Sequence, residues 1–534
     1  MTATITPYRP PEQAGRDGFA QLMHAEWTKF RTLRGWLIAI VIAAAAIAVV
    51  GVLLPHISPS HCGSRSGAAC LAIVPTGPGG EAVNDSYYLA AQPLAGDGSI
   101  TVRVTSLTGL TASQSGGFVG PNTPPSSMSP GLVPWAKAGV IITGSTRPGA
   151  AYAAMMVTGS HGVRMQYDYT GDIAGLPGSV SAASPRWLRL TRSGDVITGY
   201  DSADGTHWTE VGTVRLAGLT GTVRAGLFAT SPLDFTPNFP TYAEPGGSTS
   251  PSVATGAFDD AVLRGGAPGG QWAGQNVGAT GQNYDGPRIG LRQAGGQLTV
   301  TGSGDIGPVV TGGVNSFYLT GTLADHLFGV FIGLLIMIVV AAMFITVEYR
   351  RGLIRTTLAA SPRRGRLLAA KAVVIGLVTF VLGSAGVAVA VIAGSRIAHD
   401  SGIFVLASGW PVEAQVILGT GAMLAVASVL ALAIGTMLRR SVAAVAAVVV
   451  VIVLPYIIGV SGILPATASE WVLRVTPAAA FAIEQSVPQY QQVVGHYGPP
   501  DYYPLGPWSG LAVLCVYAAL ALGLATWLLR RRDA

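Results

Sequence analysis

The sequence predicts an α-helical polytopic membrane protein with six transmembrane helices and a large extracytoplasmic all-β sandwich between the first two. Six apolar segments are long enough to cross a bilayer, whose hydrocarbon core of about 30 Å requires about 20 helical residues. A polar insert, residues 55–326, separates the first segment from the other five and shows alternating strand patterns. Cationic residues gather in alternate loops, as expected for a chain that crosses a membrane repeatedly.

The six apolar segments contain no Asp, Glu, Lys or Arg. They are Gly35–Leu54, Leu327–Val347, Ala372–Gly394, Val416–Met437, Ser441–Val460 and Ser509–Leu529. The whole chain is 11% charged and 49% hydrophobic, whereas soluble domains are about 25% charged. We therefore interpret each segment as a membrane span.

Loops rich in Lys and Arg stay on the cytoplasmic side of a membrane, which predicts the orientation. Such residues precede the first span, fill the loop after the second, separate the fourth from the fifth and follow the sixth. Examples are Lys29, Arg34, Arg350, Arg363, Arg439, Arg440, Arg530 and Arg531. Both termini are then cytoplasmic, and residues 55–326 lie outside the plasma membrane.

The net charge of +6 belongs to these loops, so it does not predict a nucleic-acid partner. The strong preference for Arg over Lys points to a bacterial genome of high GC content.

The cytoplasmic N-terminus, residues 1–34, contains an amphipathic pattern just before the first span. Apolar residues recur at three- and four-residue spacing, which predicts a helix lying in the membrane interface. We assign to it Phe19, Met23, Glu26, Trp27 and Phe30. A generic juxtamembrane anchor would show the same spacing.

The basic loop after the second span, residues 348–371, carries a short amphipathic turn. Leu353, Ile354 and Leu358 form a small apolar face, and Pro362 should end the helix. A loop that only fixes topology needs the cations but not this apolar face.

Three motifs together resemble the permease subunit of a type-2 ABC exporter, in particular its actinobacterial members. "HAEWTKFRTLRGW" (24–36) is similar to the interfacial connecting helix, and "EYRRGLIRTTLAASPRRGRLLAAK" (348–371) to the cytoplasmic coupling helix. "LRVTPAAAFAIEQS" (473–486) is similar to a partly helical segment in the outer loop 461–508. By this resemblance, the residues that couple to an ATPase are Glu348, Arg351, Gly352, Leu353, Ile354, Arg355 and Leu358.

The resemblance implies that two permease subunits, identical or different, pair around a translocation path and that each binds a separate ATP-binding subunit. The chain has no G-x-x-x-x-G-K-[ST] motif to hold phosphates. ATP and Mg²⁺ should therefore sit on the partner, and we predict no catalytic, cofactor or metal residue in this chain, which is not an enzyme. The uncharged spans suit an amphiphilic or hydrophobic cargo.

The polar insert departs from the family's short first outer loop. Strand patterns at 99–107, 137–145, 186–212 and 223–231, with a turn at Asp204 and Gly205, predict a sandwich with its core at 80–262. This part resembles a concanavalin A-like or laminin G-like jelly roll, and residues 268–320 are predicted to be extra strands or a truncated second copy. Cys62 and Cys70 form a candidate disulfide, with two free thiols as the alternative.

A jelly-roll likeness raises a second class of function, because many such domains bind or cleave carbohydrate. The carboxylates of the insert are candidates by residue type alone. Trp135, Trp187, Tyr200 and Trp208 are candidates to stack on a cell-surface glycan, but aromatic residues in strands are more often core. The alternatives to an exporter are therefore a membrane-anchored carbohydrate-binding or sensory surface protein and, third, a membrane-bound glycosidase.

Overall fold

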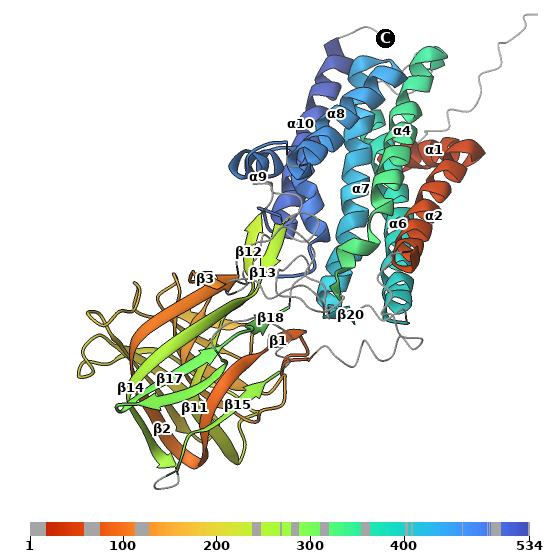
Figure 1. The fold of residues 1–534 in the computed structure, drawn as a ribbon. Helices are drawn as coiled ribbons and strands as arrows, with labels where there is room; N and C mark the ends of the chain where they lie inside the picture. The colour runs from red at the N-terminus through yellow and green to blue at the C-terminus, as the bar shows by residue number, and fades with distance from the viewer. Residues whose placement is uncertain are drawn as a thin grey trace, which may run out of the picture.

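A computed structural model of the protein describes most of the chain. The described residues are 18–57, 75–112, 128–237, 247–266, 270–278, 288–309, 320–353, 364–400, 404–406, 409–461, 463–488, 490, 492 and 503–531. They form a bundle of long helices and a separate β domain, which lies beside the end of the bundle opposite the C-terminus (Figure 1).

The helices of the bundle confirm the six predicted apolar spans. Six described helices are long and apolar enough to cross a membrane: α2 (Arg34–Ile57), α4 (Gly329–Arg350), α6 (Arg364–Asp400), α7 (Trp410–Leu438), α8 (Ser441–Val460) and α10 (Pro507–Arg531). Shorter helices are α1 (Phe19–Thr32), η1 (Leu323–His326), α9 (Ala466–Val475) and η2 (Pro477–Glu484). Helices that are apolar on all sides need an apolar surrounding, which a bilayer provides.

One end of the bundle, which we call the basic end, carries most of the arginines at helix ends. There α4 ends at Arg350, α10 ends at Arg531, and α6 begins at Arg364. The guanidinium of Arg364 donates a hydrogen bond to the carbonyl of Leu529, so the start of α6 lies beside the end of α10. The C-terminus lies at the basic end, away from the β domain (Figure 1).

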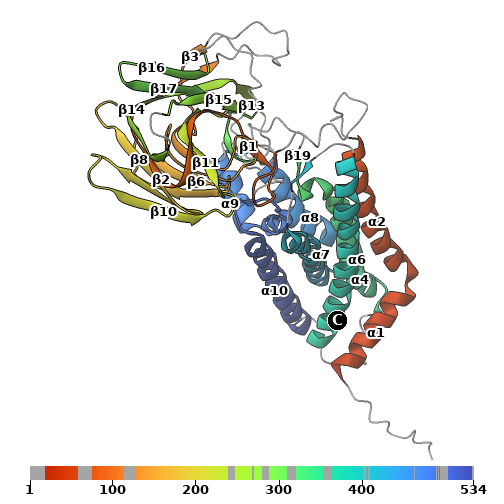
Figure 2. The same cartoon turned by 90° about the horizontal axis from the view of Figure 1, so that it is seen from below.

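Small residues let α2, α4 and α6 approach closely, and Figure 2 shows these three helices side by side with α1 at one end of them. A Cβ at Gly386 of α6 would lie 2.7 Å from the carbonyl oxygen of Ala44, and one at Gly329 would lie 2.8 Å from the Cα of Ile47. Without an aqueous phase to drive helices together, such close backbone packing stabilises a membrane bundle.

The helices α4 and α6 reach further than the apolar segments that predicted them. Glu348 lies in the last turn of α4, and Lys371 lies in the third turn of α6, which begins at Arg364 rather than at Ala372. The added residues are mostly Arg, Leu and Ala, which favour helix even where they leave the apolar stretch. Residues 354–363, and with them Ile354, Arg355 and Leu358, lie outside the described residues.

The β domain confirms the predicted all-β character. Its strands are β1 (Val83–Asp85), β2 (Tyr87–Ala112), β3 (Met128–Pro130), β4 (Lys137–Thr143), β5 (Tyr152–Thr158), β6 (Val163–Tyr167), β7 (Gly171–Ala174), β8 (Arg186–Ser193), β9 (Val196–Ser202), β10 (Thr209–Arg215), β11 (Thr222–Thr230), β12 (Asp234–Pro237), β13 (Gly247–Ser250), β14 (Ser252–Gly266), β15 (Ala273–Val277), β16 (Gly290–Ala294), β17 (Gln297–Gly302) and β18 (Ile306–Pro308).

Hydrogen bonds join most of these strands into a single 14-stranded sheet in the order β10-β9-β8-β2-β11-β4-β5-β6-β7, with β3 and β14–β17 attached to it. The long strand β2 pairs with β8 and β11, and also with β14 and β15. Register shifts along the β2–β14 pair bend both strands, so that one continuous sheet wraps around a core. A sandwich predicts two sheets, whereas the structure has one curved sheet that connects these strands. The jelly-roll order of the strands stays a prediction.

Apolar side chains at alternate positions along the strands form this core. Ile100, Val102 and Val104 of β2 are fully buried and pack in one cluster with Leu188 and Leu190 of β8. Residues between them point to the other face of the strand. The predicted turn at Asp204 and Gly205 follows β9, and Gly205 has a φ of 78°, which favours glycine.

Two contacts tie the β domain and its connecting strand to the helices. The side-chain amide of Gln492 donates a 2.9 Å hydrogen bond to the carbonyl of Tyr169 in the β domain. In addition, β19 (Thr320–Gly321) pairs in parallel with β20 (Phe404–Val405), which lies between α6 and α7.

Candidate functional site

Three helices meet in a cluster of four charged side chains at the basic end of the bundle. Lys371 of α6 donates hydrogen bonds to Glu26 of α1 at 2.6 Å and to Glu348 of α4 at 2.7 Å. Lys29, one turn after Glu26, completes the set with a 2.9 Å hydrogen bond to Glu26. Its ammonium also lies 3.6 Å from the Glu348 carboxylate. We call Glu26, Lys29, Glu348 and Lys371 the four-charge cluster.

The four-charge cluster is balanced in charge and mostly shielded from solvent. Glu26 and Lys371 are fully buried and Glu348 is 8% exposed, whereas Lys29 reaches the surface. A buried ion costs several kcal/mol unless it is paired and hydrogen-bonded. Two cations and two anions in mutual contact meet that condition, so the cluster holds three separate helices in one arrangement.

Aromatic rings enclose the inner side of the cluster. The ammonium of Lys371 lies 4.5 Å from the centroid of the Phe344 ring, a cation–π distance. Phe30 and Trp36 meet Phe344 edge to face, at 5.6 and 5.1 Å between centroids. These rings exclude water from the ion pairs and strengthen them.

The partly exposed Lys29 stays charged at neutral pH. Burial alone would lower the pKa of Lys29, but the hydrogen bond to Glu26 and the charges of both carboxylates outweigh burial. The pKa of Lys29 is therefore raised above its ordinary value, and the cluster keeps its balance of charge.

The structure places the predicted interfacial residues on helix α1, but in two different surroundings. Phe19 and Trp27 are each 39% exposed and Met23 is half-buried. Phe30 and Glu26, in contrast, face the bundle and are fully buried. Helical spacing predicts that Glu26 lies on the interfacial helix but does not indicate its partner, Lys371.

The described residues of the predicted coupling segment lie at the exposed end of α4. Arg351, Gly352 and Leu353 are exposed and follow Glu348 within five residues. The four-charge cluster is therefore directly joined to the start of that segment. Lys371 was predicted only as part of a basic loop. The rarity of Lys in the sequence could have singled out Lys371, because Lys occurs only at 29, 137 and 371 in this Arg-rich chain. In the structure each of these three lysines forms an ion pair.

The motif at 473–486 forms the end of α9 and the 3-10 helix η2, outside the six candidate spans. η2 packs against α10, where a Cβ at Gly510 would collide with the carbonyl of Ala479. Glu484 at its end is buried, and burial raises its pKa to about 8. Its carboxyl group is therefore mostly protonated at neutral pH.

The candidate aromatic residues and carboxylates of the β domain contact other residues of that domain. Trp135 is buried, while Trp187, Tyr200 and Trp208 are half-buried. Carboxylates proposed by residue type are bound to neighbours: Asp172 to Arg164, Asp195 to Arg215, Asp204 to His207 and Asp259 to Arg103.

Among the residues that the structure describes, no group of three or more His, Cys, Asp or Glu is arranged to hold a metal ion. Cys62 and Cys70 lie outside these residues, so the disulfide stays a prediction, and Cys515 is a free thiol.

Six apolar helices, two of which are tied to α1 by buried ion pairs at the basic end, define a polytopic membrane protein. The chain belongs to the ABC-2 family of transporter proteins, whose family model matches residues 192–534. It is accordingly a membrane subunit of an ABC transporter rather than an enzyme.

Comparisons with individual proteins add little to this assignment. A search among curated proteins finds no match. Solved structures with partial likeness include a functionally unknown protein from Saccharomyces cerevisiae, with 16% identity over 37% of this chain and 83% of that chain, at a TM-score of 0.21. Scytalido-glutamic peptidase covers 42% of this chain and 100% of its own at 10% identity and a TM-score of 0.23. The GH43 protein BlXynB from Bacillus licheniformis covers 25% of this chain and 24% of its own, at 19% identity and a TM-score of 0.16.

Proposed function

We propose that this chain is the permease subunit of an ATP-driven exporter in a bacterial plasma membrane. Two such subunits pair, and each binds a separate ATP-binding subunit that supplies ATP and Mg²⁺. Family membership supports the transporter class over a surface protein anchored by its spans. The observation that carries the coupling role is the four-charge cluster, which ties the helix leading into the coupling segment to two other helices.

In this proposal the basic end faces the cytoplasm and the β domain lies outside. The ATP-binding subunit docks on Arg351, Gly352, Leu353, Ile354, Arg355 and Leu358, and Glu348, which is buried in the four-charge cluster, links this surface to the bundle. A movement of this segment is passed to α1 and α6 through Lys371, because the ammonium binds carboxylates of both α1 and α4. Hydrogen-bond and salt-bridge networks between rigid helices are among the contacts that carry such coupling.

The cargo that fits the spans best is amphiphilic or hydrophobic. The spans contain almost no charged residue along their apolar lengths. A strongly charged cargo would require polar side chains along its path.

The decisive variant replaces Leu353 and Ile354 by Asp. A charge buried in an apolar docking contact should cost several kcal/mol, enough to lose most of a micromolar complex. We expect the double variant to insert normally but to retain much less ATP-binding subunit during purification. The measurement is the ratio of ATP-binding subunit to tagged permease after extraction in mild detergent.

The control is Leu33→Asp, which places one such negative charge on an exposed apolar side chain at the end of α1. It should keep the ATP-binding subunit. Undiminished capture by the double variant would show that residues 348–371 act only as a topology signal.

A further inference from the structure

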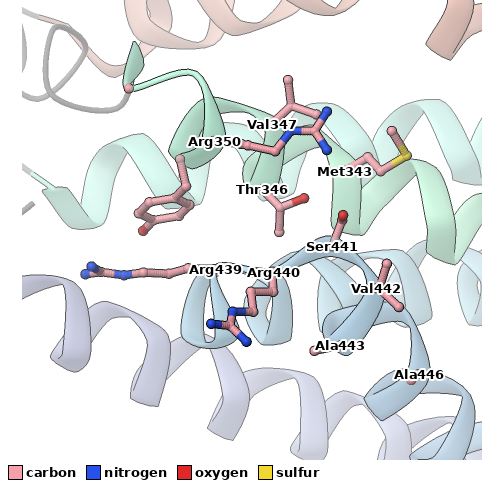
Figure 3. Close-up of a pocket in the computed structure, with 12 residues that line it drawn as sticks. Met343, Thr346, Val347, Arg350, Arg439, Arg440, Ser441, Val442, Ala443 and Ala446 are labelled. Carbon is pink, nitrogen blue, oxygen red and sulfur yellow. The ribbon is translucent and has the colours of Figure 1, made fainter.

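A second basic feature lies on a different face of α4. A cavity of about 830 Å³ separates α4 from the turn between α7 and α8 (Figure 3). From α4 it is lined by Met343, Thr346, Val347 and Arg350, whereas Glu348 turns to the four-charge cluster. The cavity does not include the four-charge cluster, although Gly352 of the coupling segment also lines it.

Three arginines line the cavity. Arg350 ends α4, while Arg439 and Arg440 form the turn between α7 and α8. In the part of the chain that the structure describes, none of the three forms an ion pair with a carboxylate. Their positive charge is thus available to a ligand.

The backbone of the turn holds these arginines in place. Arg439 adopts a left-handed conformation with a φ of 57°, and its N–H donates to the carbonyl of Gly435. Its guanidinium lies 5.1 Å from the centroid of the Tyr349 ring. The first turn of α8 begins directly after Arg440 without a side-chain cap, so its unpaired N–H groups add partial positive charge to the same place.

The other part of the cavity is apolar and belongs to the candidate membrane spans. Met343 and Val347 lie on α4, and Val442, Ala443 and Ala446 lie on α8. Val442 is 82% exposed, and the two alanines are also exposed, so this wall opens outward along α8 (Figure 3). A ligand seated here meets cations at one end and hydrocarbon at the other.

We propose that this cavity binds an anionic phospholipid from the leaflet at the basic end of the bundle. Arg350, Arg439 and Arg440 hold the phosphate headgroup, and an acyl chain lies along Met343, Val442 and Ala446. Basic pockets between transmembrane helices bind such headgroups, because Arg pairs strongly with phosphate oxygens. An acidic protein segment would satisfy the arginines but not the apolar wall at the depth of the spans. The lipid site does not rest on coupling to an ATP-binding subunit.

The test measures lipid binding to the full-length protein in detergent by native mass spectrometry. Phosphatidylglycerol and phosphatidylcholine of equal chain length are offered at equal concentration. We expect phosphatidylglycerol to bind in preference. The double variant Arg439→Gln/Arg440→Gln should bind it roughly tenfold more weakly, and Arg439→Lys/Arg440→Lys should keep most of the affinity.

Two further variants separate this cavity from general attraction to basic residues. Arg530→Gln/Arg531→Gln removes the same charge from the end of α10, which does not line the cavity, and should leave phosphatidylglycerol binding unchanged. Ala446→Trp fills the apolar part without changing charge and should weaken binding several-fold. It also carries the test if the glutamine pair fails to fold.

Four results would overturn the proposal: equal binding of the two lipids, an equal loss in the α10 control, full displacement by millimolar inorganic phosphate, or unchanged binding in Ala446→Trp. Loss of a co-purifying ATP-binding subunit from the glutamine pair, with lipid binding intact, would assign the arginines to protein docking instead.

Discussion

The Lys371 ammonium is fully buried in the bundle interior, where the carboxylates of Glu26 and Glu348 reach it from two other helices. Removing the ammonium would leave both carboxylates buried with only Lys29 nearby. We predict that Lys371→Met lowers the free energy of unfolding by about 3 to 5 kcal/mol, the usual cost of breaking a buried ion pair.

The control for that prediction removes the carboxylates as well. The triple variant Glu26→Gln/Glu348→Gln/Lys371→Met leaves no unpaired buried charge and should recover most of the stability. Thermal unfolding of the purified proteins in one detergent provides the measurement. A triple variant as unstable as the single one would mean that packing, and not charge, explains the loss.

Asp85 should make the β domain less stable as pH rises. Burial raises its pKa to about 6 from an ordinary 3.8, although the Tyr169 hydroxyl and the Gly149 N–H both donate to it. Because the folded state binds the proton more tightly than the unfolded state, stability falls as pH rises from about 4 to above 6. Asp85→Asn removes this dependence and should be more stable than wild type at pH 7.5 by about 2 to 3 kcal/mol.

The check is unfolding of wild type and Asp85→Asn at several pH values. The difference between them should shrink toward zero below about pH 3, where both the folded and the unfolded wild type carry a mostly protonated Asp85. A difference that stays constant with pH would rule out titration of this carboxyl as its cause.

At the scale of elements, the close contact of α2 with α6 depends on Gly386. A Cβ there would lie 2.7 Å from the carbonyl oxygen of Ala44, so the helices must separate to admit it. At Gly376, on the same helix, a Cβ would meet only the side chain of Val429 at 3.4 Å. Both substitutions to Ala gain helix propensity. We predict that Gly386→Ala lowers stability by about 1 to 3 kcal/mol, whereas Gly376→Ala is neutral or stabilising.

Melting temperatures of the two glycine variants, measured side by side in detergent, decide this point. If Gly386→Ala melts at or above the temperature of Gly376→Ala, the close approach of α2 and α6 does not limit stability.

The six spans could be predicted from the sequence because each is a property of one continuous segment. The ends of α4 and α6 could not, since Glu348 and Lys371 are charged and lie beyond the apolar stretch. Lys371 is buried there because it pairs with Glu26, 345 residues away in the chain. Glu26 itself was assigned to α1 without a partner, because helical spacing shows which face a residue occupies but not what covers it.

At the scale of the whole molecule, local alternation predicted strands but not their order. The single sheet arises from β2 and β14, which pair across about 150 residues and bend at register shifts. Family membership, in turn, shows that this chain is a membrane subunit of a transporter. The second permease subunit, the direction of transport and the docking of the ATP-binding subunit are proposals, and the four-charge cluster supports the coupling role among them.

The most direct test of the central proposal is the intact mass of the particle purified from its native membrane in mild detergent. The account predicts two permease chains of 54.6 kDa each together with two ATP-binding subunits, or one such chain with a related permease and the same ATPase pair. A particle that contains this chain without any ATP-binding subunit, under conditions in which the bundle remains folded, would contradict the account.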